Sequence, residues 1–142
     1  MARRRYLARL SGPLLDRVDL QVQVDPVSRT DVAATAEPGE ATAVIAARVA
    51  AARAAQHERL AGTPWRCNTE VPGQLLRGRL RLPPRCTRLL DRSLDHGSLT
   101  VRGYDRVLRA AWTLADLAGA DTPSDVHVGQ ALLWRLGEGV AP

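Results

Sequence analysis

Only one stretch of this chain alternates between apolar and polar residues as a β-strand does. Its apolar members are Val18, Leu20, Val22 and Val24, and Pro26 follows. Such alternation indicates one buried face and one wet face, which is typical of the edge of a sheet. No second strand follows along the chain, so the backbone N–H and C=O groups of this one would lack partners. We therefore expect an orphan edge strand, preceded by one short helix around Pro13–Arg17, that belongs to a larger unit.

The rest of the chain has helical periodicity, and we predict a mainly α fold of four or five helices. We expect helices at residues 40–61, 73–79, 84–96 and 100–118, and a last one that begins near Thr122. The clearest is 100–118, whose core stripe comprises Val101, Tyr104, Leu108, Ala111, Ala115 and Ala118. A polar stripe is expected on its other face: Arg102, Arg106, Arg109, Thr113 and Asp116.

The other helices also carry apolar stripes and end signals. In 40–61 the stripe is Ile45, Val49 and Ala52, and in 84–96 it is Cys86, Leu89, Leu90 and Leu94. Gly97 suits a left-handed cap after the latter. In the last helix, Thr122 is expected as N-cap with Pro123 at the first position. Its stripe is Val126, Gly129, Leu133 and Leu136.

The composition fits a globular protein with one core, at 142 residues and 45% hydrophobic content. All 20 basic residues are arginine, which we attribute to GC-rich coding, and the net charge is +5. That charge permits contact with phosphates without establishing it. Two cysteines make no disulfide framework and no metal spacing. No apolar run is long enough to span a membrane, so we expect a cytoplasmic protein.

Arginine is the residue type through which this chain could act on a nucleotide. Phosphoryl transfer spreads charge over the γ-phosphate oxygens, and a planar guanidinium can meet two of them. Arg17 lies on a short turn before an edge strand, as an arginine supplied to a neighbouring subunit would. The alternative is an arginine that merely pairs with Asp16 or Asp19.

Arg102 is the second candidate because it falls in the first turn of the 100–118 helix, where backbone N–H groups favour anions. Arg106 and Arg109 are weaker candidates on the same stripe. Asp105 is spaced to pair with Arg102 or Arg109, so a solvated, salt-bridged face is the alternative.

Several motifs of a self-sufficient ATPase are absent from the sequence. There is no G-x-x-x-x-G-K-[ST] phosphate loop, and without lysine there cannot be one. No paired acids follow an apolar strand to hold Mg²⁺. We expect no ATP hydrolysis by this chain alone. A dense basic cluster could touch DNA phosphates or could be a solvated face: Arg77, Arg79, Arg81, Arg85 and Arg88.

Three segments in order along the chain resemble the ComM-type (YifB-like) Mg-chelatase-related AAA+ ATPases. They are Tyr6–Leu20, Leu99–Leu117 and Val126–Arg135, with a minor similarity at Arg66–Asn68. The resemblance implies that residues 1–25 are the end of an AAA+ core, 26–39 a linker and hinge, and 40–137 a helical lid. Trp112 departs from the family, which often has arginine there.

The resemblance also implies roles. Arg17 matches the arginine finger that reaches ATP in the adjacent subunit, and Arg102 matches the sensor-2 arginine of the lid. ATP and Mg²⁺ would be bound only in the full-length context, which supplies Walker A and Walker B. The rest of the ATPase, the neighbouring subunits of a hexameric ring and DNA would be the partners, in branch migration during natural transformation. A stand-alone Arg-rich DNA-binding module and a structural interaction domain are the alternatives.

Overall fold

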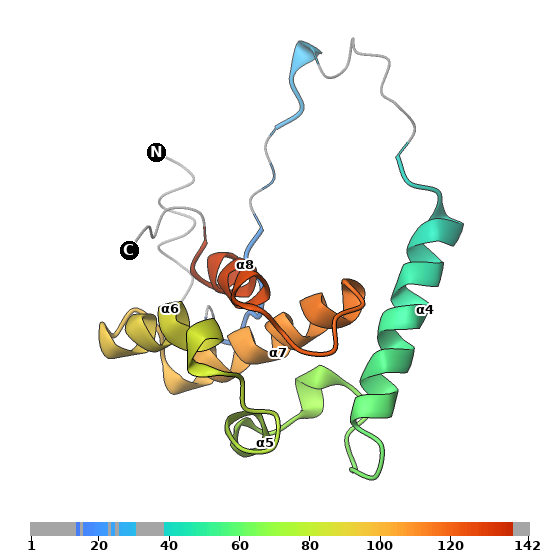
Figure 1. Ribbon diagram of the computed structural model, residues 1–142. Helices are drawn as coiled ribbons and strands as arrows, with labels where there is room; N and C mark the ends of the chain where they lie inside the picture. The colour runs from blue at the N-terminus through green and yellow to red at the C-terminus, as the bar shows by residue number, and fades with distance from the viewer. Residues whose placement is uncertain (1–13, 15, 23, 25, 31–38, 138–142) are drawn as a thin grey trace.

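A computed structural model describes residues 14, 16–22, 24, 26–30 and 39–137. Within 39–137 the elements are α4 (Thr42–Arg59), the 3₁₀ turn η1 (Asn68–Glu70), α5 (Gly73–Arg77), α6 (Pro84–Asp95), α7 (Val101–Leu117) and α8 (Asp125–Leu136) (Figure 1). The predicted mainly α class is confirmed. None of the helices described is long and apolar enough to cross a membrane.

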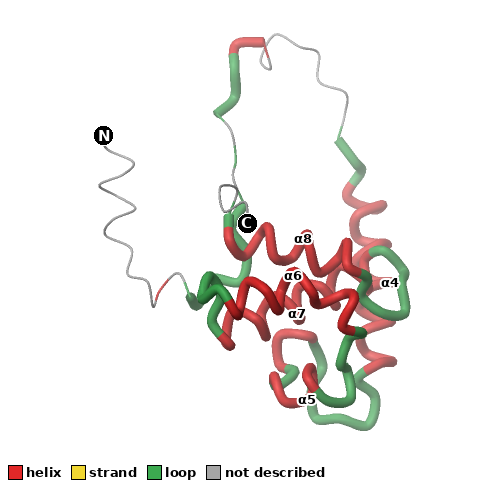
Figure 2. The backbone as a smooth tube through the Cα atoms, turned by 60° about the vertical axis from the view of Figure 1, so that its left-hand side comes forward, coloured by secondary structure: helices red, strands yellow, loops and turns green. Residues whose placement is uncertain are grey.

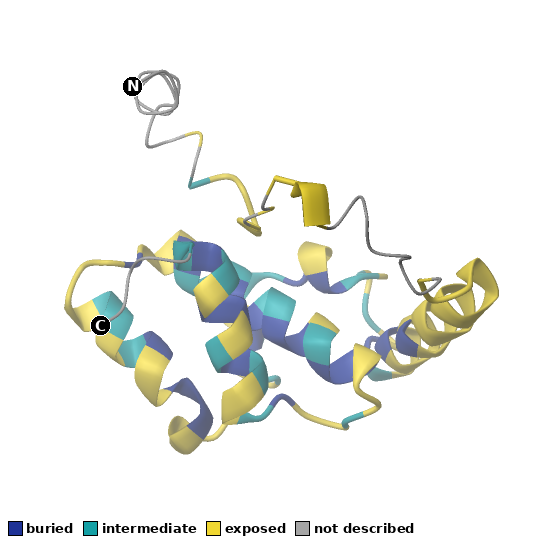
Figure 3. Ribbon diagram, turned by 90° about the horizontal axis from the view of Figure 1, so that it is seen from above, coloured by how far each residue is buried: buried dark blue, intermediate teal, exposed yellow. Residues whose placement is uncertain are grey.

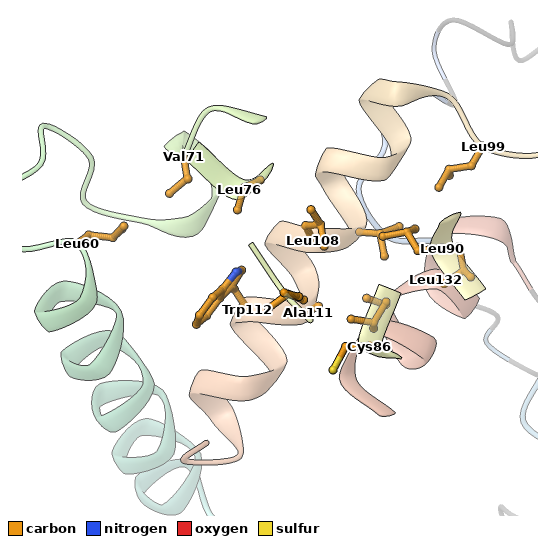
Figure 4. Packing of buried hydrophobic residues seen from close by; sticks show 14 residues of the cluster. Leu60, Val71, Leu76, Cys86, Leu90, Leu99, Leu108, Ala111, Trp112 and Leu132 are labelled. Carbon is orange, nitrogen blue, oxygen red and sulfur yellow. The ribbon is translucent and has the colours of Figure 1, made fainter. Parts of the chain in front are cut away.

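Helix α7 is the centre of the bundle, and every other element of 39–137 packs against it. Ala111 and Ala115 are fully buried on α7, and their small side chains let α8 approach closely through Ala131. The hydrophobic core is one cluster that extends along α7, as Figure 4 shows. The larger members are Leu60, Val71, Leu76, Leu90, Leu99, Leu108, Trp112 and Leu132. Figure 2 shows α6, α7 and α8 grouped together, with α4 beside them.

The predicted core stripe of α7 is correct in its middle and wrong at its ends. Val101 is 59% exposed and Ala118 is exposed, whereas Gly103 is the buried residue of the first turn. The buried face instead includes Val107 and Trp112, which the sequence analysis omitted. Asp116, expected on the polar face, is only 5% exposed.

Helix α8 begins two residues later than expected, with Ser124 rather than Thr122 as its N-cap. Ser124 Oγ accepts from the N–H of His127, and Nδ1 of His127 accepts from the N–H of Ser124, which forms a capping box. Pro123 therefore lies outside the helix, where its buried ring packs on the core. Two backbone donors are satisfied by this arrangement.

The apolar stripe expected on α8 faces outward. Val126 is 72% and Leu133 is 55% exposed, whereas Val128, Ala131 and Leu132 face the core. In α6, likewise, Leu89 is exposed while Cys86 and Leu90 are buried. Both helices thus have apolar residues on more than one face, so periodicity alone could not say which face is buried.

The predicted edge strand does not form within residues 18–22 and 24, which have no strand hydrogen bonds; Gln23 and Asp25 lie outside the described residues. Among the described residues no strand pairs with this segment, which bonds to the end of α8. The N–H of Gln21 donates to the carbonyl of Trp134 at 2.6 Å, and its Nε2 donates to the carbonyl of Arg135 at 3.1 Å. Of the expected linker, residues 31–38 are outside the described part, as are residues 1–13.

Only the second half of α4 packs on the bundle. Ala52 and Gln56 are buried against α7, whereas Ile45 and Val49 on the same face are 41% and 44% exposed. Figure 3 shows this outer half with exposed residues all around it. The predicted stripe is therefore real, but it extends beyond the end of α7.

Candidate functional site

Arg102 lies in the first turn of α7 with an exposed guanidinium. Thr100 caps the helix, since its Oγ1 accepts from the N–H of Gly103 at 3.0 Å. The Arg102 side chain is 60% exposed, and its ion pair with Asp16 is long, at 3.7 Å from Nη1 to Oδ2. A loosely held guanidinium beside the positive end of a helix can exchange its carboxylate for another anion.

Asp16 is held mainly by another residue, Arg135 near the end of α8. Arg135 Nη2 donates to Asp16 Oδ1 at 2.7 Å and to the Asp16 carbonyl at 3.3 Å, while Nη1 donates to the carbonyl of Val18 at 2.6 Å. Thr100 Oγ1 also donates to Asp16 Oδ1, at 3.1 Å. The Arg135 side chain is only 9% exposed. We call this the Asp16–Arg135 clamp, and it fixes the turn at residues 16–18 on the helical bundle.

Arg17 lies on that clamped turn and is exposed. Its N–H donates to the carbonyl of Leu14 at 3.0 Å. The alternative, in which Arg17 merely pairs with Asp16 or Asp19, is not what the structure shows. Asp16 pairs with Arg102 and Arg135, and Asp19 pairs with Arg106. Across the part of the chain that the structure describes, the Arg17 guanidinium makes no ion pair. Its backbone is therefore held on the clamped turn, while its guanidinium has no ionic partner among the described residues.

Arg106 and Arg109 are engaged by the protein itself. Arg106 pairs with Asp19, is 19% exposed, and has an Nε that is buried without a hydrogen-bond partner among the described residues. Arg109 donates from Nε to the carbonyl of Val71 at 2.9 Å. Both guanidiniums hold neighbouring segments against α7.

Asp105 does not pair with Arg102 or Arg109, as its helical spacing suggested. It forms an ion pair with Arg77 of α5 instead. The reason is the close approach of α5, where Gly73 leaves room: a Cβ on Gly73 would lie 1.9 Å from Asp105 Oδ2. This contact also removes Arg77 from the set of uncommitted arginines.

The other members of the basic cluster differ in their contacts. Arg79 Nη2 donates weakly to the carbonyl of Arg59 at 3.4 Å. Arg81, Arg85 and Arg88 are exposed, and no ion pair within the described residues involves them. These three form the part of the cluster that is open to an external anion.

A buried polar cluster joins α4, η1 and α7. Asp116 accepts a bidentate ion pair from Arg59, with Nη2 to Oδ2 at 2.7 Å, and Asn68 Nδ2 donates to the same Oδ2 at 3.0 Å. Asn68 also accepts from Arg59 at 2.9 Å and donates to Thr113 at 3.0 Å. The Arg59 guanidinium carbon lies 4.4 Å from the centroid of the Trp112 ring, a cation–π contact. The cluster is structural, because each charge is paired inside the fold.

Residues 39–135 match the family described as magnesium chelatase, subunit ChlI C-terminal. The chain belongs to this family. Residues 1–32 match a second family, described as magnesium chelatase, subunit ChlI. The Asp16–Arg135 clamp joins one residue of each matched range.

Relatives with curated sequences place this magnesium chelatase C-terminal domain near the ComM-type proteins, as predicted. An uncharacterized protein of Mycobacterium tuberculosis is 47% identical over 133 residues, which cover 94% of this chain and 26% of that protein. Competence protein ComM of Haemophilus influenzae is 34% identical over 131 residues, with 92% and 25% covered. YifB of Escherichia coli is 33% identical over the same length. The chain spans about a quarter of the length of these relatives.

Two features of the magnesium chelatase C-terminal domain were missed by sequence reasoning. Arg135 ended the third resembling segment but was given no partner, and Asn68 was noted only as part of a turn. The burial of Arg135 had no clear signal either, because the apolar pattern of α8 does not say which of its faces is buried. The pairing with Asp16, 119 residues away, had no signal in the sequence. Groups of three or more His, Cys, Asp or Glu suited to a metal ion are absent from the described residues.

Proposed function

We propose that this chain supplies two nucleotide-directed arginines to a ComM-type AAA+ ATPase, Arg17 as an arginine finger and Arg102 as the sensor-2 residue of a helical lid. The proposal rests on one observation: some of the candidate arginines are bonded within the fold and others are not. Arg106 and Arg109 are tied to the fold, while Arg17 has no ionic partner in the described chain and Arg102 has one long contact. Family membership supplies the context.

Each arginine would stabilise the negative charge that develops on ATP during hydrolysis. A guanidinium aimed at the γ-phosphate stabilises the negative charge of the transition state, and the loss of a finger lowers turnover by about 10³-fold or more. The fixed turn at Arg17 supports this role, since a finger must be positioned before the reaction. The phosphate loop and the Mg²⁺ ligands would come from the rest of the ATPase, so that turnover needs the full-length protein. Coupling to DNA branch migration in a hexameric ring is part of the same proposal.

The test is turnover of a full-length ATPase that contains this sequence. Arg17→Ala and Arg102→Ala are each expected to lower kcat by at least about 10²-fold. Arg66→Ala is the matched control, since Arg66 is an exposed arginine with no ion pair in the described chain. Wild-type turnover in both variants would reject the proposal.

Subunit mixing separates the two roles. Subunits with Arg17→Ala and subunits with a dead phosphate loop are mixed in equal amounts. If Arg17 acts on the neighbour's ATP, mixed rings regain turnover, because an intact loop then meets an intact finger. If Arg102 acts on ATP of its own subunit, the same mixture with Arg102→Ala stays inactive. The opposite pattern would reverse the assignment.

A second candidate function is favoured by Arg81, Arg85 and Arg88, which are exposed and without acidic partners in the described residues. These residues could bind nucleic-acid phosphates without ATP. The 142-residue chain would then bind a fluorescent DNA duplex with micromolar affinity and a salt slope that falls in the triple glutamine variant. A salt slope unchanged by the three substitutions would reject this function.

A further inference from the structure

Helix α8 has a second apolar face that is largely uncovered in the described chain, although Leu136 at its end is partly buried against the core. Val126, Gly129, Leu133 and Leu136 are spaced as one stripe, and Val126 and Leu133 are more than half exposed. Val128 and Ala131 pack on the core, and the buried Leu132 lies between that face and the outer stripe. A helix at the surface of a domain ordinarily has a polar outer face. The outer stripe therefore indicates a contact surface.

A groove of about 650 Å³ lies between this stripe and α6. Its apolar lining is Leu89, Leu132, Leu133 and Leu136. Gly129 opens the middle of the groove, because a Cβ there would meet no atom within 4 Å. From Gly129 to Leu136 the α8 wall rises about 10 Å, or two helical turns. That length suits the apolar face of a short helix.

The polar residues that line the groove give it a positive charge. Arg92 and His96 line it, and no Asp or Glu does. The hydroxyls of Ser93 and Ser98 are already used, since they donate to the carbonyls of Leu89 and Ser93 at 3.0 and 2.9 Å. Arg92 makes no ion pair among the described residues. The groove thus presents an apolar floor with one arginine, Arg92, on its rim.

We propose that this groove binds an amphipathic helix of another polypeptide, with leucine-sized side chains on one face and carboxylates along the edge that meets Arg92. Charge argues against a second copy of this chain packed groove to groove, because Arg92 would then face Arg92 of the copy. The apolar floor argues against nucleic acid, whose backbone has nothing of leucine size to bury. The inference is independent of the nucleotide roles of Arg17 and Arg102.

The test uses the 142-residue chain and a labelled 18-residue peptide with leucine at positions i, i+3 and i+7 and glutamate beside them. Fluorescence anisotropy is expected to give a Kd of about 10–100 μM, typical of a small groove. A peptide with lysine in place of glutamate is expected to bind at least about fivefold more weakly, and a scrambled peptide with the same composition not at all.

Variants locate the binding. Leu133→Asp is expected to weaken binding at least about tenfold, because it places a charge on the apolar floor. Arg92→Glu should reverse the preference between the glutamate and lysine peptides. Val44→Asp is the matched control, at a 54% exposed apolar residue on α4, and should bind as the wild type does. Circular dichroism confirms that each variant is folded.

Four results would overturn the proposal. They are failure of the glutamate peptide to bind, equal affinity for the lysine peptide, equal weakening by Val44→Asp, and displacement of the peptide by a 20-base-pair DNA duplex. Sedimentation velocity could give a fifth result against the proposal. A concentration-dependent dimer that Leu133→Asp abolishes would assign the groove to a second copy instead. Loss of ATPase in the Arg17 or Arg102 variants has no bearing on any of these results.

Discussion

Arg135 Nη2 lies 2.7 Å from Asp16 Oδ1 and joins the end of α8 to a turn 119 residues earlier in the chain. The same guanidinium donates to the carbonyls of Asp16 and Val18, so one nearly buried side chain fixes three acceptors. Hydrogen bonds to charged groups stabilise more than neutral ones. The position of Arg17 on the surface of the helical bundle therefore depends on a residue that contacts no nucleotide in the proposed mechanism.

Replacement of Arg135 by glutamine is expected to release the turn at residues 16–18. The loss of charge-assisted bonds of roughly 1.5–3 kcal/mol should raise the population of the open segment at least about tenfold. Limited trypsin digestion with mass spectrometry measures this as faster cleavage after Arg17. Gln130→Ala, at an exposed position of the same helix, should leave the cleavage rate unchanged. Equal rates in Arg135→Gln and wild type would show that the clamp does not hold the segment.

The substitution Asp116→Asn is expected to lower the free energy of unfolding by about 3–5 kcal/mol, because it leaves the mostly buried charge of Arg59 without its carboxylate. Urea denaturation followed by circular dichroism measures the change. Asp121→Asn is the control, since Asp121 is exposed and makes no ion pair in the described chain. A loss below 1 kcal/mol would mean that the cluster of Arg59, Asn68 and Asp116 contributes little to the fold.

The N-terminal cap of α8 can be tested with alanine substitutions at Ser124 and Thr122, which are two residues apart. Ser124→Ala should lower the stability by about 1 kcal/mol, since the N–H of His127 loses its acceptor. Thr122→Ala should change it by less than about 0.5 kcal/mol, as an exposed residue outside the helix. Thermal unfolding at neutral pH compares them. A larger loss of stability in Thr122→Ala than in Ser124→Ala would instead indicate Thr122 as the N-cap.

Tyr104 makes the stability depend on pH in the alkaline range. Burial and the hydrogen bond from its hydroxyl to Asp91 Oδ1, at 2.7 Å, raise the pKa of Tyr104 to about 12. The unfolded tyrosine ionises near its ordinary pKa of 10. The protonated hydroxyl therefore stabilises the fold fully below pH 10, and this stabilisation is lost as the pH rises toward 12.

The variant Tyr104→Phe isolates this effect. It should be about 1 kcal/mol less stable than the wild type below pH 9, through loss of the hydrogen bond. The difference should shrink between pH 10 and 12, where only the wild type has Tyr104 to deprotonate. Urea denaturation at a series of pH values measures both proteins. A constant difference across this range would show that Tyr104 titrates with its ordinary pKa in the fold.

The sequence was a good guide to where helices lie and a poor guide to which face they bury. Local signals such as Gly97 at a positive φ and Thr100 at an N-cap mark ends, and they act over a few residues. The buried face depends on the neighbour instead. On α8 the apolar residues Val126 and Leu133 compete with Val128 and Leu132, and only contact with α6 and α7 decides between them.

The same distinction holds for the candidate site. The arginines were identified from their place on a turn and in a first helical turn, which are local properties. Which arginines are engaged was beyond the sequence, because the partners Asp19, Val71 and Asp16 come from distant segments. Asp116 was misassigned for the same reason, since its partner Arg59 is 57 residues away.

The outer half of α4 extends past the end of α7 without a packing partner among the described residues. Its backbone hydrogen bonds are then stabilised only by the helix propensity of an alanine-rich sequence, which is marginal over so few turns. Amide hydrogens before Ala52 should accordingly exchange with solvent through local fraying, while those after it open only with the bundle. One continuous helix thus divides into two parts of different lifetime, and the division falls where α7 ends.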